Sequence, residues 1–193
     1  GSIILQLILG LTIAILLDKR FPGRNIVRGV ILFSYLVPEI VAVIVWKFML
    51  SESTGIINYF IKEFLHLAPL SWFSSRVAML GVIIVNVWKY FPFMVIVFLA
   101  QLQGIDKTYY EAARIDGANA FKEFWYITLP FLKPVIIIAV MLRTIFTLQN
   151  FNLIALLTGG GPLNYTTTLP IEIYETTFKE FYYIINFILF NIT

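Results

Sequence analysis

The chain has 193 residues, of which 60% are hydrophobic and 13% are charged, whereas soluble domains are about half apolar and about a quarter charged. The composition therefore indicates a membrane protein. There is no cysteine, one histidine and a net charge of +3, which exclude a disulfide framework, a metal site built on Cys or paired His, and a nucleic-acid-binding surface.

Five hydrophobic segments follow one another along the chain and predict one all-α, polytopic transmembrane domain over residues 1–193. They cover residues 3–17, 30–50, 77–103, 134–158 and 178–193. About 20 apolar residues of helix cross a bilayer core of ~30 Å, and lipid offers no partners for backbone polar groups, so each span is expected to be helical. The first segment is short and the last stops with the sequence, so we expect a chain that is incomplete at both ends. Pro92 is expected to kink the third span.

The segment between the second and third spans contains an amphipathic stretch at residues 55–66. Apolar side chains recur there at helical spacing, while Asn58, Lys62, Glu63 and His66 occupy the opposite face. This pattern predicts a helix along the outer membrane surface. Such a helix serves either as a gate or docking ledge over a cavity or as a simple tethered loop.

A polar, helix-forming stretch at residues 105–130 separates the third and fourth spans and is longer than a turn requires. Asp106 and Asn119 are placed to cap two short helices, Gly117 is placed to end the first, and Pro130 is placed to end the second. These residues predict a helical hairpin.

The first helix of this hairpin groups small residues around a single acid. Ala112, Ala113, Gly117 and Ala118 allow close backbone approach, and Glu111 supplies a charge that a basic residue could pair with. The grouping predicts that the hairpin docks as a unit on a partner protein.

Basic residues predict the orientation of the chain. Eight Lys and Arg side chains lie in the loop 18–29 and in the segment 105–133, against two in the segments 51–76 and 159–177 on the other side. The hairpin is therefore expected in the cytoplasm.

Several short motifs occur in order along the chain. They are Phe21-Pro22-Gly23-Arg24, Val45-Trp46-Lys47, Trp88-Lys89-Tyr90-Phe91-Pro92-Phe93, Glu111-Ala112-Ala113 with Asp116 and Gly117, Ile127-Thr128-Leu129-Pro130, and Leu157-Thr158-Gly159-Gly160-Gly161-Pro162. On these residues the chain resembles the permease subunits of binding-protein-dependent ABC importers. More narrowly, it resembles the first permease subunit of the maltose-type, carbohydrate-uptake branch.

The resemblance implies the type I ABC importer transmembrane fold, with about five helices seen of a six-helix core, in a bacterial or archaeal cell (inner) membrane. It implies a second permease subunit, two cytoplasmic ATPase subunits and an extracytoplasmic solute-binding protein as partners, lipid around them, and no nucleic acid. ATP and Mg would bind the ATPase and no cofactor would bind this chain, which has no phosphate-binding loop and is not expected to be an enzyme. The hairpin would couple to the ATPase through Glu111, Ala112, Ala113, Arg114, Asp116, Gly117 and Ala118.

Polar residues inside the spans are candidates for handling the solute, which the resemblance implies is a sugar or a related molecule, because such residues are costly in lipid. With neighbouring aromatic residues the set is Glu39, Arg143, Phe146, Gln149, Asn150, Phe151 and Asn152. Hydrogen bonding between helices accounts equally well for the amides, and Glu39 could instead face Arg143 or Lys89.

Three other functions stay open. The chain could import another solute, such as an amino acid, a polyol phosphate or an ion. It could be a structural scaffold or assembly factor. A membrane-embedded enzyme would need a nucleophile or metal ligands at membrane depth, and the spans offer no Cys and no His pair.

Overall fold

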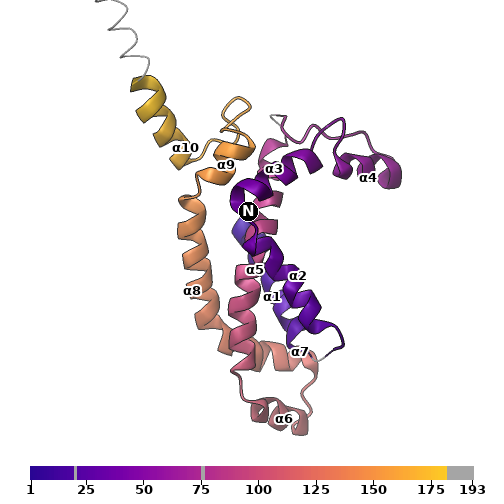
Figure 1. Ribbon diagram of the computed structural model, residues 1–193. Coiled ribbons are helices and arrows are strands. Elements are labelled where there is room, and N and C mark those ends of the chain that lie inside the picture. The colour runs from indigo at the N-terminus through magenta and orange to yellow at the C-terminus, as the bar shows by residue number, and fades with distance from the viewer. Residues whose placement is uncertain (20, 75–76, 182–193) are drawn as a thin grey trace, which may run out of the picture. The chain divides into compact units, whose positions relative to one another are not determined.

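The computed structural model describes residues 1–19, 21–74 and 77–181. All regular secondary structure in these residues is helical, which confirms the predicted all-α class. The elements are α1 (Ser2–Asp18), α2 (Arg24–Leu36), α3 (Glu39–Met49), α4 (Ile56–Leu65), α5 (Ala78–Gln103), α6 (Lys107–Ile115), α7 (Ala120–Glu123), η1 (Phe124–Thr128), α8 (Leu129–Leu148), α9 (Asn152–Leu157), α10 (Leu169–Tyr174) and η2 (Glu175–Glu180) (Figure 1). Most of the expected fifth span, 178–193, lies outside the described residues.

The chain forms two compact units, each built from two stretches of sequence. The first unit comprises residues 1–37 and 86–145, and the second comprises residues 38–85 and 146–193. Helices α5 and α8 each contribute residues to both units.

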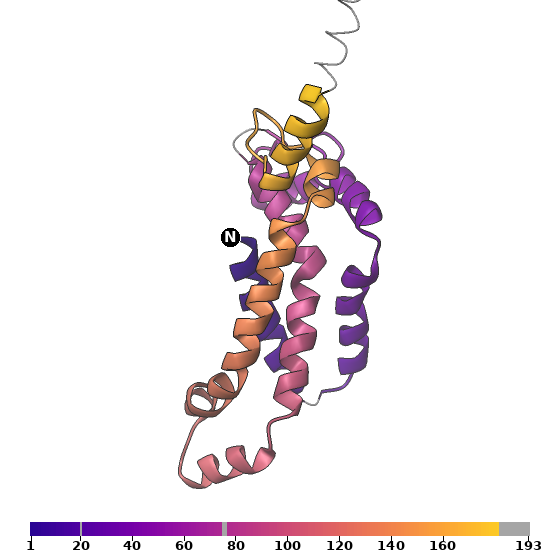
Figure 2. The ribbon, with the colours of Figure 1, turned by 90° about the vertical axis from the view of Figure 1, so that its left-hand side faces the viewer.

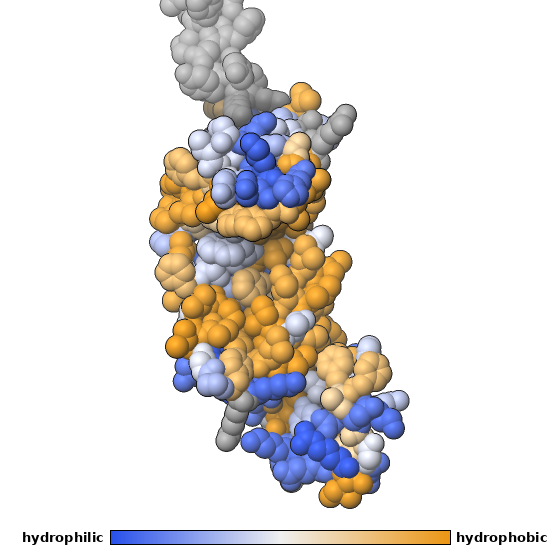
Figure 3. Space-filling view, turned by 90° about the vertical axis from the view of Figure 1, so that its right-hand side faces the viewer, coloured by the Kyte–Doolittle hydropathy of each residue, from blue (hydrophilic) through white to orange (hydrophobic). Residues whose placement is uncertain are grey.

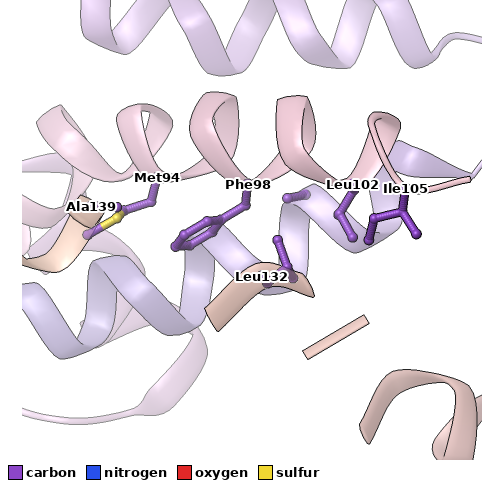
Figure 4. Packing of buried hydrophobic residues seen from close by; sticks show 7 residues of the cluster. Met94, Phe98, Leu102, Ile105, Leu132 and Ala139 are labelled. Atoms are coloured by element: carbon purple, nitrogen blue, oxygen red, sulfur yellow. The ribbon is translucent and has the colours of Figure 1, made fainter. Parts of the chain in front are cut away.

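The core of the first unit lies where α5 meets α1 and α8. Met94, Phe98, Leu102 and Ile105 point toward Leu132 and Ala139 of α8 (Figure 4), and Ala14 of α1 completes the cluster. The α5 members recur every fourth residue, as one face of a helix requires. A Cβ added at Gly10 of α1 would overlap Met94, so the absent side chain lets α1 and α5 pack closely.

A buried asparagine holds together the loop between α3 and α5 in the second unit. Asn58 Nδ2 donates to the carbonyl of Leu70 at 2.9 Å, while Oδ1 accepts from the Leu70 N–H and from Trp72 Nε1, both at 3.0 Å. Asn58, predicted on the polar face of the amphipathic helix, is buried, because its amide makes these hydrogen bonds inside the unit. The apolar side of α4, including Phe60 and Phe64, is exposed, as in a helix that lies on a membrane surface.

Two segments expected as single spans are interrupted. The segment expected over 30–50 forms α2 and α3, which are separated at Val37 and Pro38, because proline has no N–H and disfavours helical geometry in the residue before it. The segment expected over 134–158 forms α8 and the short helix α9. Asn150 Oδ1 accepts from the Leu153 N–H at 3.1 Å, a local hydrogen bond that favours a new helix start over continuation.

Proline does not end the second helix of the hairpin. Helix α7 continues through the π-helical turn η1 into α8, which contains both Pro130 and Pro134, so the prediction of a stop at Pro130 is wrong. In this turn the Leu129 N–H donates to the carbonyl of Phe124, five residues back instead of four. The wider turn lets the helix continue although Pro130 has no backbone N–H to donate.

Two helices in the described part of the chain are long and apolar enough to cross a membrane. They are Ala78–Gln103 and the continuous helix Ala120–Leu148, and α2 with α3 adds a third if the broken pair counts as one span. Pro92 lies inside α5, which is helical on both sides of it.

Candidate functional site

Side-chain caps define the two short helices of the hairpin in the first unit. Asp106 Oδ1 accepts from the Thr108 N–H at 3.0 Å at the start of α6, and this hydrogen bond lowers the pKa of the Asp106 carboxyl. Gly117 follows α6 with φ 78, a left-handed conformation that favours glycine. Asn119 Oδ1 accepts from the Lys122 N–H at 3.0 Å at the start of α7. The caps lie at the residues where the sequence pattern predicts them.

An ion pair joins the two helices of the hairpin. Arg114 Nε donates to Glu123 Oε1 at 2.7 Å, and Nη2 lies 3.4 Å from Oε2, so the pair is bidentate. The hydrogen bond to Glu123 raises the pKa of Arg114. Tyr110 and Thr128 make a second link, with 3.0 Å between their hydroxyl oxygens. Arg114 therefore links α6 to α7.

The hairpin exposes apolar and aromatic side chains. No residue of α6 or α7 is buried, and Ile115 is 87% exposed, Phe121 72% and Tyr126 79%. Figure 2 shows the hairpin between the end of α5 and the start of α8. The space-filling view in Figure 3 shows a largely hydrophilic surface at this end, with some hydrophobic side chains. Glu111 and Ala112 are also exposed. A folded, capped hairpin with this much exposed apolar surface is typical of a protein-binding site.

A buried polar cluster in the first unit joins three helices. Gln6 of α1 donates from Nε2 to Asn86 Oδ1 of α5 at 2.8 Å and accepts from Arg143 Nε of α8 at 2.9 Å. The Arg143 guanidinium also lies 4.3 Å from the ring centre of Tyr90. Arg143 is 4% exposed, and its Nη2 has no hydrogen-bond partner in the part of the chain that the structure describes. Such a group inside a membrane span points to a function.

Sequence reasoning identified Arg143 but missed Gln6 and Asn86. Both stand alone in apolar runs, Gln6 between Leu5 and Leu7 and Asn86 between two valines. The same rule that selected Arg143, that polar residues within a span need a reason, would have found them.

The other residues predicted to handle solute belong to the second unit and are described within it. Phe151 packs against Tyr174 with 5.1 Å between ring centres, and Asn150 makes the hydrogen bond that starts α9. Phe146, Gln149 and Asn152 are exposed. Glu39 is the first residue of α3, where its charge is favourable at the positive end of the helix dipole.

Lys89 stabilises the end of α2 where the broken span is interrupted. Its ammonium group donates to the carbonyls of Ser34 at 3.0 Å, Tyr35 at 2.8 Å and Val37. These carbonyls lie at the negative end of the α2 dipole and have lost their helical partners, so a buried cation suits them.

Acidic residues and the histidine do not gather into a metal site in the described residues. Among residues 1–19, 21–74 and 77–181, no group of three or more His, Asp or Glu side chains could hold a metal ion.

Comparison with known proteins gives a match over almost the whole chain. Residues 6–192 match the family described as binding-protein-dependent transport system inner membrane component. The trehalose/maltose transport system permease MalF of Thermococcus litoralis is 43% identical over 171 residues, which are 88% of this chain and 58% of that protein. The sulfoquinovosyl glycerol transport system permease SmoG of Agrobacterium fabrum is 35% identical, over 89% of this chain and 56% of that protein. The chain therefore spans less than two thirds of the length of these relatives.

A solved structure shares the fold. It is a chain of a bacterial alginate ABC transporter crystallised with an alginate pentasaccharide-bound periplasmic protein, with a TM-score of 0.81 and 24% identity, over 93% of this chain and 63% of that chain. At this identity the likeness concerns the fold, and it bears out the predicted type I importer architecture.

Proposed function

Because this chain belongs to the family of binding-protein-dependent transport system inner membrane components, we propose that it is a permease subunit of an ATP-driven ABC importer for a sugar or a related solute. The subunit would form half of the translocation pathway. The hairpin of α6 and α7 would connect it to a separate ATPase.

The observation that carries this proposal is the exposed hairpin in a chain of this family. Both short helices are capped and are tied together by Arg114 and Glu123, yet Ile115 and Phe121 are exposed. A cleft on an ATPase subunit would cover this surface, and Glu111 would pair there with a basic residue. Among the remaining coupling residues, Ala112, Ala113, Gly117 and Ala118 are small and allow the close approach that such docking needs. Asp116 is the residue that ends α6.

The solute class is supported by the relatives and by the polar cluster. The relatives' names include trehalose/maltose and sulfoquinovosyl glycerol transport, which are carbohydrate-type solutes. Gln6, Asn86 and Arg143 place amide and guanidinium groups inside a membrane span, and these groups hydrogen-bond hydroxyls well. We extend the predicted solute pathway to Gln6 and Asn86, beside Glu39, Arg143 and the residues Phe146, Gln149, Asn150, Phe151 and Asn152.

The subunit would work in a complex with several partners. A second permease subunit completes the pathway, two ATPase subunits bind ATP and Mg on the cytoplasmic side, and an extracytoplasmic protein delivers the solute. The subunit itself binds no cofactor. The complex lies in a bacterial or archaeal inner membrane with the hairpin in the cytoplasm.

The first test removes the proposed charge pairing at the ATPase. In the full-length permease, Glu111→Lys is expected to lower both ATPase co-purification and solute uptake at least about tenfold, as loss of one buried interface anchor does. Glu63→Lys makes the same change on the exposed face of α4 and serves as the matched control. Membrane insertion is expected to match wild type in both variants.

Two other results would contradict parts of this proposal. If no ATPase accompanies the wild-type permease in mild detergent, the coupling function is excluded. If the ATPase binds but the cognate binding protein selects amino acids or ions in a solute screen, the importer function stands and the sugar class is wrong.

A further inference from the structure

A narrow apolar groove runs between α1, α2 and α5 of the first unit. Side chains from all three helices line it, among them Leu17, Ile31 and Leu99, and its volume is about 260 Å³. One end of the groove is polar, where Arg28 and Gln103 line it. The groove is separate from the buried polar cluster and from the exposed surface of the hairpin.

Positive charge accumulates at the polar end of this groove. Arg24 and Arg28 are one turn apart on α2. When the side-chain amide of Gln103 is oriented with its oxygen toward them, this oxygen accepts from Arg28 Nη2 at 2.7 Å and from Arg24 Nη2 at 3.3 Å. Like charges one turn apart repel each other. Arg28 Nε is buried without a hydrogen-bond partner in residues 1–19, 21–74 and 77–181. Two cations thus converge on one neutral amide.

The start of α2 adds to this positive field. The first turn of α2 contains no acidic residue, and Gly23 at its N-cap offers no side chain to cap it. The N-terminal end of a helix carries partial positive charge and favours anions. The nearby Asp18 accepts from Arg24 Nη1 through its backbone carbonyl at 3.4 Å, not through its carboxylate. Arg24 and Gln103 also line a neighbouring cavity with Asp18, Glu111 and Glu123. No acidic residue lines the groove itself, where Arg28 lies, so its polar end is complementary to an anion.

The surroundings of the groove point to lipid. The outer face of α2 is apolar and exposed, with Ile26 at 73%, Phe33 at 65% and Leu36 at 75% exposure, as on a helix that faces hydrocarbon. Gln103 is the last residue of α5, at the point where the membrane-spanning helix gives way to the polar hairpin. The basic end of the groove therefore lies at the level of the lipid headgroups.

We propose that this groove binds one anionic phospholipid, with an acyl chain along the apolar part and the phosphate on Arg24 and Arg28. Basic pockets between membrane helices favour anionic headgroups, and arginine pairs with phosphate through two parallel hydrogen bonds. Only apolar side chains line the groove beyond Arg28 and Gln103, which suits an acyl chain. Assignment to the cytoplasmic leaflet rests on the proposed function, which places the hairpin in the cytoplasm.

The test measures selective lipid binding by the full-length importer complex. Purified wild-type complex is expected to retain phosphatidylglycerol in native mass spectrometry, and added phosphatidylglycerol is expected to raise its melting temperature by about 5 °C. Phosphatidylcholine and inorganic phosphate are each expected to do less. Arg28→Gln should lose most of this rise, while Lys133→Gln, which removes an exposed charge at the start of α8, should keep it.

A second variant tests the apolar part of the groove independently. Ala100 lines the groove, so Ala100→Phe should fill it and reduce retention of phosphatidylglycerol while Arg24 and Arg28 stay in place. Equal effects of phosphatidylglycerol and phosphatidylcholine would overturn the proposal, as would an equal rise with inorganic phosphate or no rise at all. So would unchanged retention in both variants, including the case in which another part of a longer chain covers the groove. ATPase co-purification, measured on the same preparations, reports separately on the proposed function.

Discussion

Gln6 is completely buried and bridges two other polar residues, Arg143 and Asn86. A hydrogen bond to a charged group inside a membrane span can serve packing between helices, solute recognition or both. The two roles differ in which further substitutions would restore the function of a variant. A packing role needs only matched shapes and no unsatisfied groups, whereas recognition needs the polar atoms themselves.

This difference gives a prediction at Gln6. Gln6→Leu leaves Arg143 Nε and the Asn86 amide without partners, so it should lower the free energy of unfolding by about 1–3 kcal/mol, measured by thermal denaturation in detergent. The triple variant Gln6→Leu/Asn86→Leu/Arg143→Met replaces the whole cluster by apolar groups and should recover most of that stability. We expect uptake to be lost in both variants.

Recovery of uptake together with stability in the triple variant would contradict a role in solute handling. The cluster would then be a packing contact between α1, α5 and α8. A triple variant that stays as unstable as Gln6→Leu would show that the apolar replacements do not fit the site, and the separate variants Asn86→Leu and Arg143→Met would then be compared.

At the level of elements, the sequence rules predicted the positions of helix caps better than the positions at which helices are interrupted. Asp106, Gly117 and Asn119 act within two or three residues of themselves, so their roles depend little on the rest of the fold. Prolines behave differently. The helix is interrupted at Pro38 but continues through Pro92 and Pro130.

The reason is that the outcome at a proline depends on where the freed backbone groups find partners. After α2, the ammonium group of Lys89 takes up three carbonyls, which compensates the break beside Pro38. Lys89 is more than 50 residues away in sequence from these carbonyls. Local pattern therefore predicts a weak point at each proline, and distant contacts decide which of them ends a helix.

The ion pair between α6 and α7 carries a prediction of its own. Arg114→Glu should disconnect the two helices and lower ATP-driven uptake several-fold, while the melting temperature changes little because an exposed ion pair contributes little to stability. The charge-swapped variant Arg114→Glu/Glu123→Arg should restore part of the uptake. Uptake assays in vesicles and thermal denaturation give the two readouts.

Failure of the swap would separate two roles of Arg114. If uptake stays low in the swapped variant although the hairpin is folded, Arg114 contacts the ATPase directly rather than through Glu123. If Arg114→Glu transports normally, the ion pair has no part in coupling.

For the whole molecule, the hydrophobic pattern was sufficient to predict an all-α membrane fold. A long, continuous apolar segment can satisfy its backbone hydrogen bonds in lipid by forming a helix. The length and composition of these segments are therefore enough to predict the fold class. The buried polar residues were less predictable. Asn58 has the same local pattern as the exposed Lys62 and Glu63, and only its contacts with Leu70 and Trp72 reveal that it is buried.

The orientation of the chain is the prediction that belongs to this scale. The 193 residues contain no cysteine, so a single cysteine placed here in a full-length permease freed of any others gives an unambiguous label. In a permease expressed without its ATPase, which would otherwise cover this site, Ala112→Cys on the exposed hairpin should react with a membrane-impermeant maleimide in inside-out vesicles and not in intact spheroplasts. Ser53→Cys, in the exposed loop before α4, should show the reverse. The reversed pattern, or labelling of both sites only in intact spheroplasts, would contradict a cytoplasmic hairpin. Contact with a cytoplasmic ATPase would then be impossible, because no ATPase could reach α6.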